Sequence, residues 1–317
     1  MAEIIAGVAC SHTPQLSMGP EMWSVHSRLV DHMLVDMETR LAEADPRLNE
    51  ETESERVRAK YAECQAQLAR LNSLLIEAKP DVVLIFGDDH REVFGDDCSP
   101  AVALYCGDEV WDLPTDDIKL ESQRASEWAY HGDTAVKYAT AGDLGTHVAL
   151  TLAESGFDPA VLNTIPKGRS LGHAFTFVKR RLPGDGDWQM LPIWLNAFYQ
   201  PNRPSAARCF NVGQAVRKAV ESWSGNERVA IVASGGLSHY VVDEQFDRRF
   251  LEALEAKDAT YLSSVPRSCL ESGSGEVRMW IAAAGALEGL SLSESAYVPG
   301  YRSAAGTGVG LGFAAWS

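Results

Sequence analysis

Three histidines stand directly after short apolar segments of the chain. His12 follows residues 4–10, His90 follows residues 81–86 and His239 follows residues 228–233. Short runs of this kind, rich in β-branched residues and bounded by polar ones, predict buried strands. Ligands of an open α/β sheet bind beyond the carboxyl ends of its strands, so we expect the three imidazoles to meet at one crevice.

Acidic side chains come shortly after the third histidine, at Asp243, Glu244 and Asp247. Two neutral imidazoles and one carboxylate on one face of a metal are the ligand set of non-haem Fe(II) oxygenases, because the other face stays open for substrate and oxygen. Triplet dioxygen reacts slowly with closed-shell aromatic compounds, and a redox-active metal that binds both provides a route for electrons. Residues of these types fit such a centre, but His12, His90 and the acids are far apart in the sequence and no short signature links them.

The segments that must position these residues alternate between strand and helix. Strands are predicted at residues 4–10, 81–86, 101–105, 160–165, 191–198 and 228–233. Helices are predicted at residues 52–78, 144–154, 172–181, 209–223, 244–256 and 275–284, followed by a tail rich in Gly, Ala and Ser at 300–312. This alternation predicts an α/β fold, in which one domain, residues 1–317, has a central mixed sheet flanked by helices and a metal site at the strand ends.

Composition narrows the classes of partner. The 317 residues are 45% hydrophobic and 23% charged, the ordinary balance of a globular protein. The formal net charge of −16 repels polyanions, so no nucleic acid partner is expected. No apolar run approaches the roughly 20 residues of a membrane helix, and no signal peptide is visible, which predicts a cytoplasmic protein without membrane contact. The six cysteines form no CxxC pair, so neither a disulfide framework nor a zinc knuckle is expected.

Ordered segments along nearly the whole chain resemble the class III extradiol ring-cleavage dioxygenases, whose type member is the β subunit of protocatechuate 4,5-dioxygenase. These segments are SHTP (11–14), DVVLIFGDDH (81–90), GHAF (172–175), RCFNVG (208–213), GGLSH (235–239), EQFD (244–247) and ESGSG (271–275). Two more, GHAFTFV (172–178) and LPIWLN (191–196), resemble the single-chain branch that acts on methoxylated or carboxylated catechols such as 3-O-methylgallate and gallate.

The resemblance implies Fe(II) held by His12, His90 and an acid from the segment after His239. In the type member the acid directly precedes a Phe-Asp pair, a position that Gln245 occupies here. We predict that Glu244, one residue earlier, is the metal ligand, because a neutral amide would leave the divalent ion with less compensating charge; Asp243 is the alternative. Asp247 is expected in the first turn of a helix, where the helix dipole stabilises an acid without any metal.

The same resemblance assigns roles to other polar residues. His173 resembles the acid/base that takes a proton from the catechol, which suits an imidazole with an ordinary pKa of about 6.5. His239 is predicted as a second catalytic residue that hydrogen-bonds a substrate oxygen, with a purely structural role as the alternative. Thr13, Ser272 and Ser274 are predicted to contact the substrate.

An anionic substrate needs local cations, because the net charge of the protein opposes its entry. Four cations near the matched segments are candidates for this contact, and the sequence favours none of them: Lys167, Arg169, Arg203 and Arg278.

The function predicted is that of an Fe(II)-dependent extradiol dioxygenase, which opens the ring of a carboxylated or methoxylated catechol with dioxygen. The alternatives are a zinc enzyme of the same fold and a non-catalytic metal-binding relative. Residues 15–79 are expected to form a helical insertion that acts as a lid over the site or as a dimer element, and we expect a homodimer.

Overall fold

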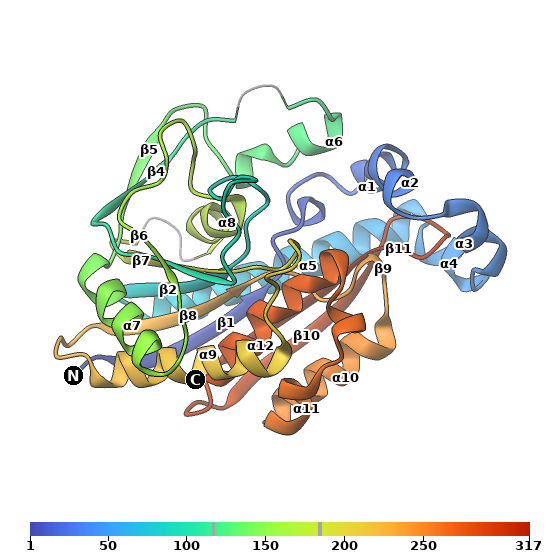
Figure 1. Cartoon of the computed structure of the whole chain (residues 1–317). Helices are drawn as coiled ribbons and strands as arrows, with labels where there is room; N and C mark the ends of the chain where they lie inside the picture. The colour runs from blue at the N-terminus through green and yellow to red at the C-terminus, as the bar shows by residue number, and fades with distance from the viewer. Residues whose placement is uncertain (116–117, 183–185) are drawn as a thin grey trace.

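The computed structural model describes residues 1–115, 118–182 and 186–317, and these build one large mixed sheet covered by helices (Figure 1). The order of the sheet is β10 (Leu292–Tyr301), β11 (Thr307–Trp316), β1 (Glu3–Cys10), β8 (Arg228–Ser234), β2 (Val82–Gly87), β7 (Gln189–Leu195), β3 (Val102–Tyr105) and β6 (Ala160–Leu162). The short strand β9 (His239–Val241) pairs with β11, and β4 (Glu109–Asp112) pairs with β5 (Val136–Ala139) in a separate ribbon. The predicted α/β class is confirmed.

Four neighbouring strands at the centre run parallel. β1 pairs with β8, β8 with β2 and β2 with β7, each in parallel register. Their carboxyl ends therefore lie along one edge of the sheet, which is where parallel sheets collect ligands. The residues that follow Cys10, Gly87 and Ser234 emerge side by side at that edge, as the sequence predicted.

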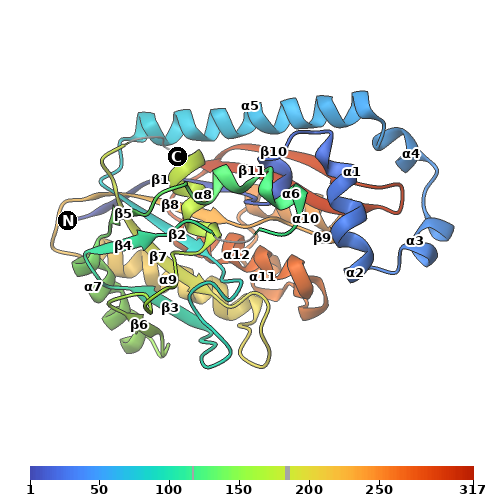
Figure 2. The ribbon, with the colours of Figure 1, turned by 90° about the horizontal axis from the view of Figure 1, so that it is seen from above.

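Alternate side chains of the central strands enter two separate cores. Leu84 and Phe86 of β2 pack on one face with α7 (Gly142–Glu154), α9 (Ala206–Ser222) and α12 (Val277–Ala286). Val83 and Ile85 pack on the other face with α5 (Ser54–Ala78) and α8 (His173–Arg181). Figure 2 shows α5 along one side of the sheet and α9 and α12 on the other. With both faces covered, β2 is buried throughout, which explains its continuous run of apolar residues.

The Gly-rich tail is a hairpin, a feature that the sequence analysis missed. β10 and β11 pair antiparallel, and β11 also pairs antiparallel with β1, so the last strand lies inside the sheet. Glycine usually weakens a strand, but here neighbouring groups need the space: a methyl group on Gly312 would approach Leu237 and Trp280. Close packing against these side chains therefore requires glycine, and the glycines made the segment look unlike a strand in the sequence.

Short helices precede α5 and lie beside the strand ends. They are α1 (Met22–His26), a π-helical turn (Ser27–Asp31), α2 (His32–Leu34), α3 (Met37–Glu43) and α4 (Arg47–Glu51). The predicted insertion thus has two parts. α5 is a layer of the core, whereas residues before it border the site described below. α6 (Glu121–Arg124), α10 (Glu244–Glu255) and α11 (Ala259–Ser264) complete the helices of the described residues. Among these helices, none has a stretch long and apolar enough to cross a membrane.

Candidate active site

A cavity of about 560 Å³ opens at the carboxyl edge of the central strands. Five histidines line it, at positions 12, 26, 90, 173 and 239, together with Glu276. Apart from His26 in α1, these residues come from the ends of β1 and β2 and from the starts of β9, α8 and α12. The predicted convergence of His12, His90 and His239 on one crevice is what the structure shows.

His12 is held so that one ring nitrogen is ready to bind a cation. Its Nδ1 lies 3.0 Å from the Ser234 hydroxyl, which donates its own hydrogen to the Ala174 carbonyl at 2.6 Å. Since that hydroxyl has one hydrogen, it accepts from Nδ1–H, and Nε2 carries the lone pair. Nε2 lies 3.5 Å from Glu276 Oε2 and 3.7 Å from Asp88 Oδ1.

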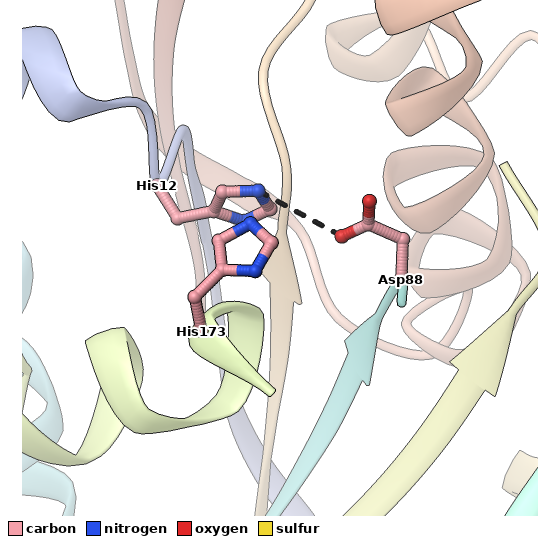
Figure 3. A group of neighbouring side chains, drawn as sticks. All are labelled: His12, Asp88 and His173. Carbon is pink, nitrogen blue, oxygen red and sulfur yellow. Dashed lines mark ion pairs between the residues drawn. The ribbon is translucent and has the colours of Figure 1, made fainter. Parts of the chain in front are cut away.

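Two buried carboxylates face the imidazoles. Asp88 projects from the end of β2 toward His12, with His173 beside it (Figure 3). One of its oxygens lies 3.0 Å from Nε2 of His90, and neither oxygen accepts a well-directed hydrogen bond within the described part of the chain. Glu276 accepts a hydrogen bond from the Gly236 N–H at 2.7 Å and lies 3.3 Å from Nε2 of His239.

The carboxylates dominate the electrostatics of the imidazoles. Burial, the largest single effect, lowers the pKa of His12 and His239, but the charge and hydrogen bonding of Glu276, together with Asp88 at His12 and the Leu237 carbonyl at His239, raise the pKa of both overall. In the same way Asp88 raises the pKa of His90 to about 9 against the effect of burial. Burial would raise the pKa of Glu276, yet His239 and His12 hold it well below its usual range. The site thus keeps an ionised carboxylate away from bulk water, a typical environment for a bound cation.

Backbone contacts fix the imidazole of His239. Its Nδ1 donates to the Leu237 carbonyl at 2.9 Å, and its backbone N–H donates to the Ser274 hydroxyl at 2.9 Å. Gly236 and Gly273 lie against the His239 side chain. A methyl group at either position would collide with it, so only glycine leaves room for the ring. Nε2 therefore points at Glu276 and into the cavity with little freedom to turn.

A glutamate orients His173 in the first turn of α8. Oε1 of Glu92 lies 2.8 Å from Nδ1 of His173 and accepts a second hydrogen bond from its backbone N–H at 2.8 Å. Nδ1–H thus donates to a carboxylate, which leaves Nε2 able to accept a proton. The ring lies 4.6 Å from that of His12 and 4.7 Å from that of His90, measured between centroids. The His173 ring therefore lies beside both of these imidazoles.

The donor atoms fit a divalent transition metal. Ligand atoms of His12, Asp88 and His173 lie within 4.8 Å of one another, as do those of Asp88, His90 and Glu276. Nε2 of His12 is buried and lacks a hydrogen-bond partner among the described residues, so a lone pair is available for coordination. Imidazole nitrogens with carboxylate oxygens suit Fe(II), and also Zn(II).

The structure does not bring Glu244 to the histidines, and this corrects the predicted ligand set. Glu244 begins α10 and accepts hydrogen bonds from Arg47, Arg248 and Tyr301 at 3.0, 3.0 and 2.7 Å. It lines a different, polar hollow. Asp243, the alternative, caps the same helix by accepting from the Phe246 N–H. The physical reason is that α10 starts beyond β9, which carries the chain away from the cavity, so the carboxylates beside the imidazoles are Asp88 and Glu276.

Of the three residues predicted to contact the substrate, one lines the cavity and two do not. Thr13 lines the cavity. Ser274 lies behind the site and supports His239, whereas Ser272 sits in a turn with a φ of 52° and does not line the cavity. None of the four candidate cations lines it either: Arg203 pairs with Glu271, Arg278 donates to backbone carbonyls, Arg169 donates to the Val93 carbonyl, and Lys167 lies elsewhere on the surface.

Glu276 carries a signal in the sequence that the predicted ligand set does not include. Glu276 directly follows the matched segment ESGSG and precedes the buried helix α12. An acid that opens such a helix and is itself buried needs a charged or metal partner. Asp88 and Glu92 flank His90 in the sequence and could have been found as its neighbours.

The sheet brings His12, His90, His173 and His239 together with Asp88 and Glu276 beyond its strand ends, and two groups among these side chains could hold a metal ion. Residues 48–310 match the family model for the catalytic LigB subunit of aromatic ring-opening dioxygenases, and the chain belongs to this family. A gallate dioxygenase of Pseudomonas putida strain KT2440 is 35% identical over 121 residues, which are 35% of this chain and 34% of that protein. The match thus spans about a third of the relative's length.

Proposed function

We propose that the chain is an Fe(II)-dependent extradiol dioxygenase that opens the ring of a catechol bearing a carboxylate or methoxy group. Membership of the ring-opening dioxygenase family supports the reaction class, and the name of the gallate dioxygenase relative supports the substrate class. The observation that carries the proposal is the position of Glu276, which lines the cavity with His12 and His90 and completes two imidazoles and one carboxylate.

Glu276 is the preferred carboxylate ligand. Asp88 is equally close to the imidazoles, but it does not line the cavity. A metal that binds substrate must face the cavity, so we assign the ligands as His12, His90 and Glu276. Asp88 then lies behind the site, where its carboxylate adds negative charge beside Nε2 of His12 and Nε2 of His90.

The other two histidines handle protons and position the substrate. Bound Fe(II) supplies a site where a catechol and dioxygen meet and exchange electrons. Nε2 of His173 accepts the proton of a catechol hydroxyl, while Glu92 stabilises the resulting imidazolium through Nδ1–H. Nε2 of His239, held beside Glu276, donates a hydrogen bond to a substrate oxygen when protonated. Phe198 stacks edge-on against His90 and supplies an apolar wall for the ring.

Oxygen uptake tests the proposal. Protein reconstituted with Fe(II) without air is mixed with gallate, 3-O-methylgallate, protocatechuate or catechol in an oxygen electrode. We expect one dioxygen consumed per ring opened, with both oxygen atoms in the product. Turnover that needs Zn(II) but no oxygen would identify the zinc alternative, and absence of turnover with every diol and either metal would identify a non-catalytic relative.

Two further expectations stay predictions. The homodimer is tested by sedimentation of the purified chain, and the cytoplasmic location by fractionation of the cells that produce it. Either result leaves the assignment of the reaction untouched, because every proposed ligand and proton carrier comes from one chain.

A further inference from the structure

The cavity wall that faces the histidines is built from the N-terminal helices and the end of β10. His26, Val30 and Leu34 line it from α1, the π-helical turn and α2. Arg302, the first residue after β10, lines it from the hairpin. Among the described residues, Arg302 and Lys119 are the basic side chains that line the cavity. A ligand in the cavity can therefore contact these two cations.

Arg302 is a buried cation with a free donor. Its side chain is 4% exposed, and Nη2 lies 2.8 Å from Oδ1 of Asp31, which is fully buried. Nε has no hydrogen-bond partner among the described residues. A buried donor without a partner costs about 1–3 kcal/mol, and an arginine so placed in a cavity wall is suited to receive an anion.

The backbone around Arg302 and Asp31 fixes the pair. The Arg302 N–H donates to the Thr307 carbonyl at 2.7 Å, which closes the hairpin. Asp31 ends the π-helical turn, and Ser27 at the start of that turn contacts the Thr307 hydroxyl at 3.3 Å. π-helical turns are rare and occur often at functional sites, because the extra residue re-aims the side chains that follow. The guanidinium is therefore preorganised before any ligand arrives.

The charges of the cavity require such a group. Glu92, Glu127 and Glu276 line it with negative charge, and the protein as a whole carries −16. A carboxylate that enters without a cation would be desolvated among like charges. Asp31 takes one edge of the guanidinium and keeps it in place, while the remaining N–H groups are available to a planar carboxylate.

We propose that Arg302, positioned by Asp31, determines specificity by binding the carboxylate of an aromatic substrate whose diol faces the histidines. This inference rests on the proposed ring-cleavage function and deepens it: it selects aromatic acids over neutral catechols of the same ring pattern. Arg302 binds substrate and takes no part in the oxygen chemistry.

Gallate and pyrogallol test this assignment, because they share three hydroxyl groups and differ by one carboxylate. The measured quantity is the ratio of kcat/KM for gallate to that for pyrogallol with ferrous enzyme. A double variant, Arg302→Gln with Asp31→Asn, removes both charges and leaves no unpaired ion. We expect the ratio to fall roughly tenfold to hundredfold, the usual loss for a charge-assisted hydrogen bond. The ratio does not depend on the fraction of enzyme that folds.

Two single variants complete the test. Arg302→Lys keeps the charge without the planar fork, so part of the preference for gallate should return. Lys119→Gln removes the exposed cation of the same wall and should change the ratio less than the double variant does. An unchanged ratio in the double variant, or a larger loss in Lys119→Gln, would overturn the role of Arg302 while ring cleavage persists. Absence of oxygen uptake with either diol in the wild type would instead overturn the proposed function.

Discussion

The two ends of the cavity are built in different ways. At the histidine end, His12 and Asp88 come just after β1 and β2, and Ser234 ends β8; these strands pair with one another in the core of the sheet. At the opposite end, His26, Val30 and Arg302 come from short helices and from the end of a hairpin. The strands hold the first set through the core, whereas a few polar contacts, chiefly Asp31 with Arg302, hold the second.

We assign the metal and the reaction to the histidine end of the cavity, and substrate recognition to the opposite end. Metal ligands require positions fixed within fractions of an ångström, which central parallel strands provide. Substrate recognition tolerates replacement of short helices and loops, since these carry little of the core. Changes at the histidine end should therefore abolish metal binding or turnover, while changes at the opposite end should alter selectivity, affinity or local stability.

Replacement of the carboxylate ligand gives the largest expected effect. Glu276→Gln keeps the size of the side chain and its acceptor for the Gly236 N–H but removes the charge. We expect iron affinity to fall by more than the roughly tenfold to hundredfold typical of lost outer-sphere partners, and ring cleavage to disappear with it. Iron per chain, measured by mass spectrometry after gel filtration, and oxygen uptake check this.

Glu244→Gln is the matched control. This substitution removes the same charge as Glu276→Gln does. The side chain of Glu244 is 19% exposed and forms ion pairs with Arg47 and Arg248. Such surface pairs contribute about 0–1 kcal/mol, so iron content should equal that of the wild type. Loss of iron from Glu244→Gln with retention in Glu276→Gln would restore the ligand predicted from sequence. Equal losses in Glu276→Gln and Asp88→Asn would make both carboxylates ligands.

The contrast between Glu276 and Glu244 also explains which site residues could be predicted from the sequence. His12 and His90 were found because each directly follows an apolar strand, a local pattern that needs no knowledge of packing. Glu244 lies away from the imidazoles, whereas Glu276 is distant in sequence from both and reaches them because α12 packs under β8 and the Gly235-Gly236 turn. Spacing in the chain carries no information about that contact.

The fold shows the same limit. The buried strands β2 and β8 were predicted from short runs of β-branched residues, and the helix α5 was predicted from the periodicity of its apolar residues. β11 was not predicted, because glycine is uncommon in strands. Its glycines are required by close neighbours such as Trp280. Arg302 was missed for a related reason: its role depends on Asp31, which lies far away in the chain and reaches it only through the pairing of β10 with β11.

Removal of the carboxylate behind His173 comes next in size. Glu92→Gln keeps an acceptor for the backbone N–H of His173 but no longer stabilises its protonated ring. We expect kcat to fall roughly tenfold to hundredfold, less than the roughly 10²–10⁴-fold of general acid–base catalysis because His173 itself remains, with KM and iron content unchanged. Steady-state oxygen uptake with metal analysis checks this, and a parallel loss of iron would make Glu92 part of the metal site instead.

His26 gives a smaller, pH-dependent effect at the recognition end. Burial, followed by the charge of Arg302, lowers its pKa from 6.5 to about 3. A depressed histidine pKa means that the folded state resists protonation, so its contribution is complete above pH 6.5 and is lost as the pH falls below it. Relative to His26→Gln, the wild type should lose about 2 kcal/mol between pH 7 and pH 5. Urea unfolding at the two pH values measures the difference, and equal losses in both proteins would contradict it.

The smallest expected effect concerns the apolar part of the same wall. Val30 lines the cavity from the π-helical turn, and Val30→Ala removes apolar surface that the aromatic ring would cover. At about 0.8 kcal/mol per buried methylene, KM should rise roughly threefold to tenfold while kcat stays the same. Met33→Ala is the control, since Met33 lies on the neighbouring helix, is 62% exposed and does not line the cavity. Equal KM values for both variants would mean that the N-terminal helices cover the cavity without touching the substrate, and a fall in kcat for Val30→Ala would mean that the recognition end also positions the reacting ring.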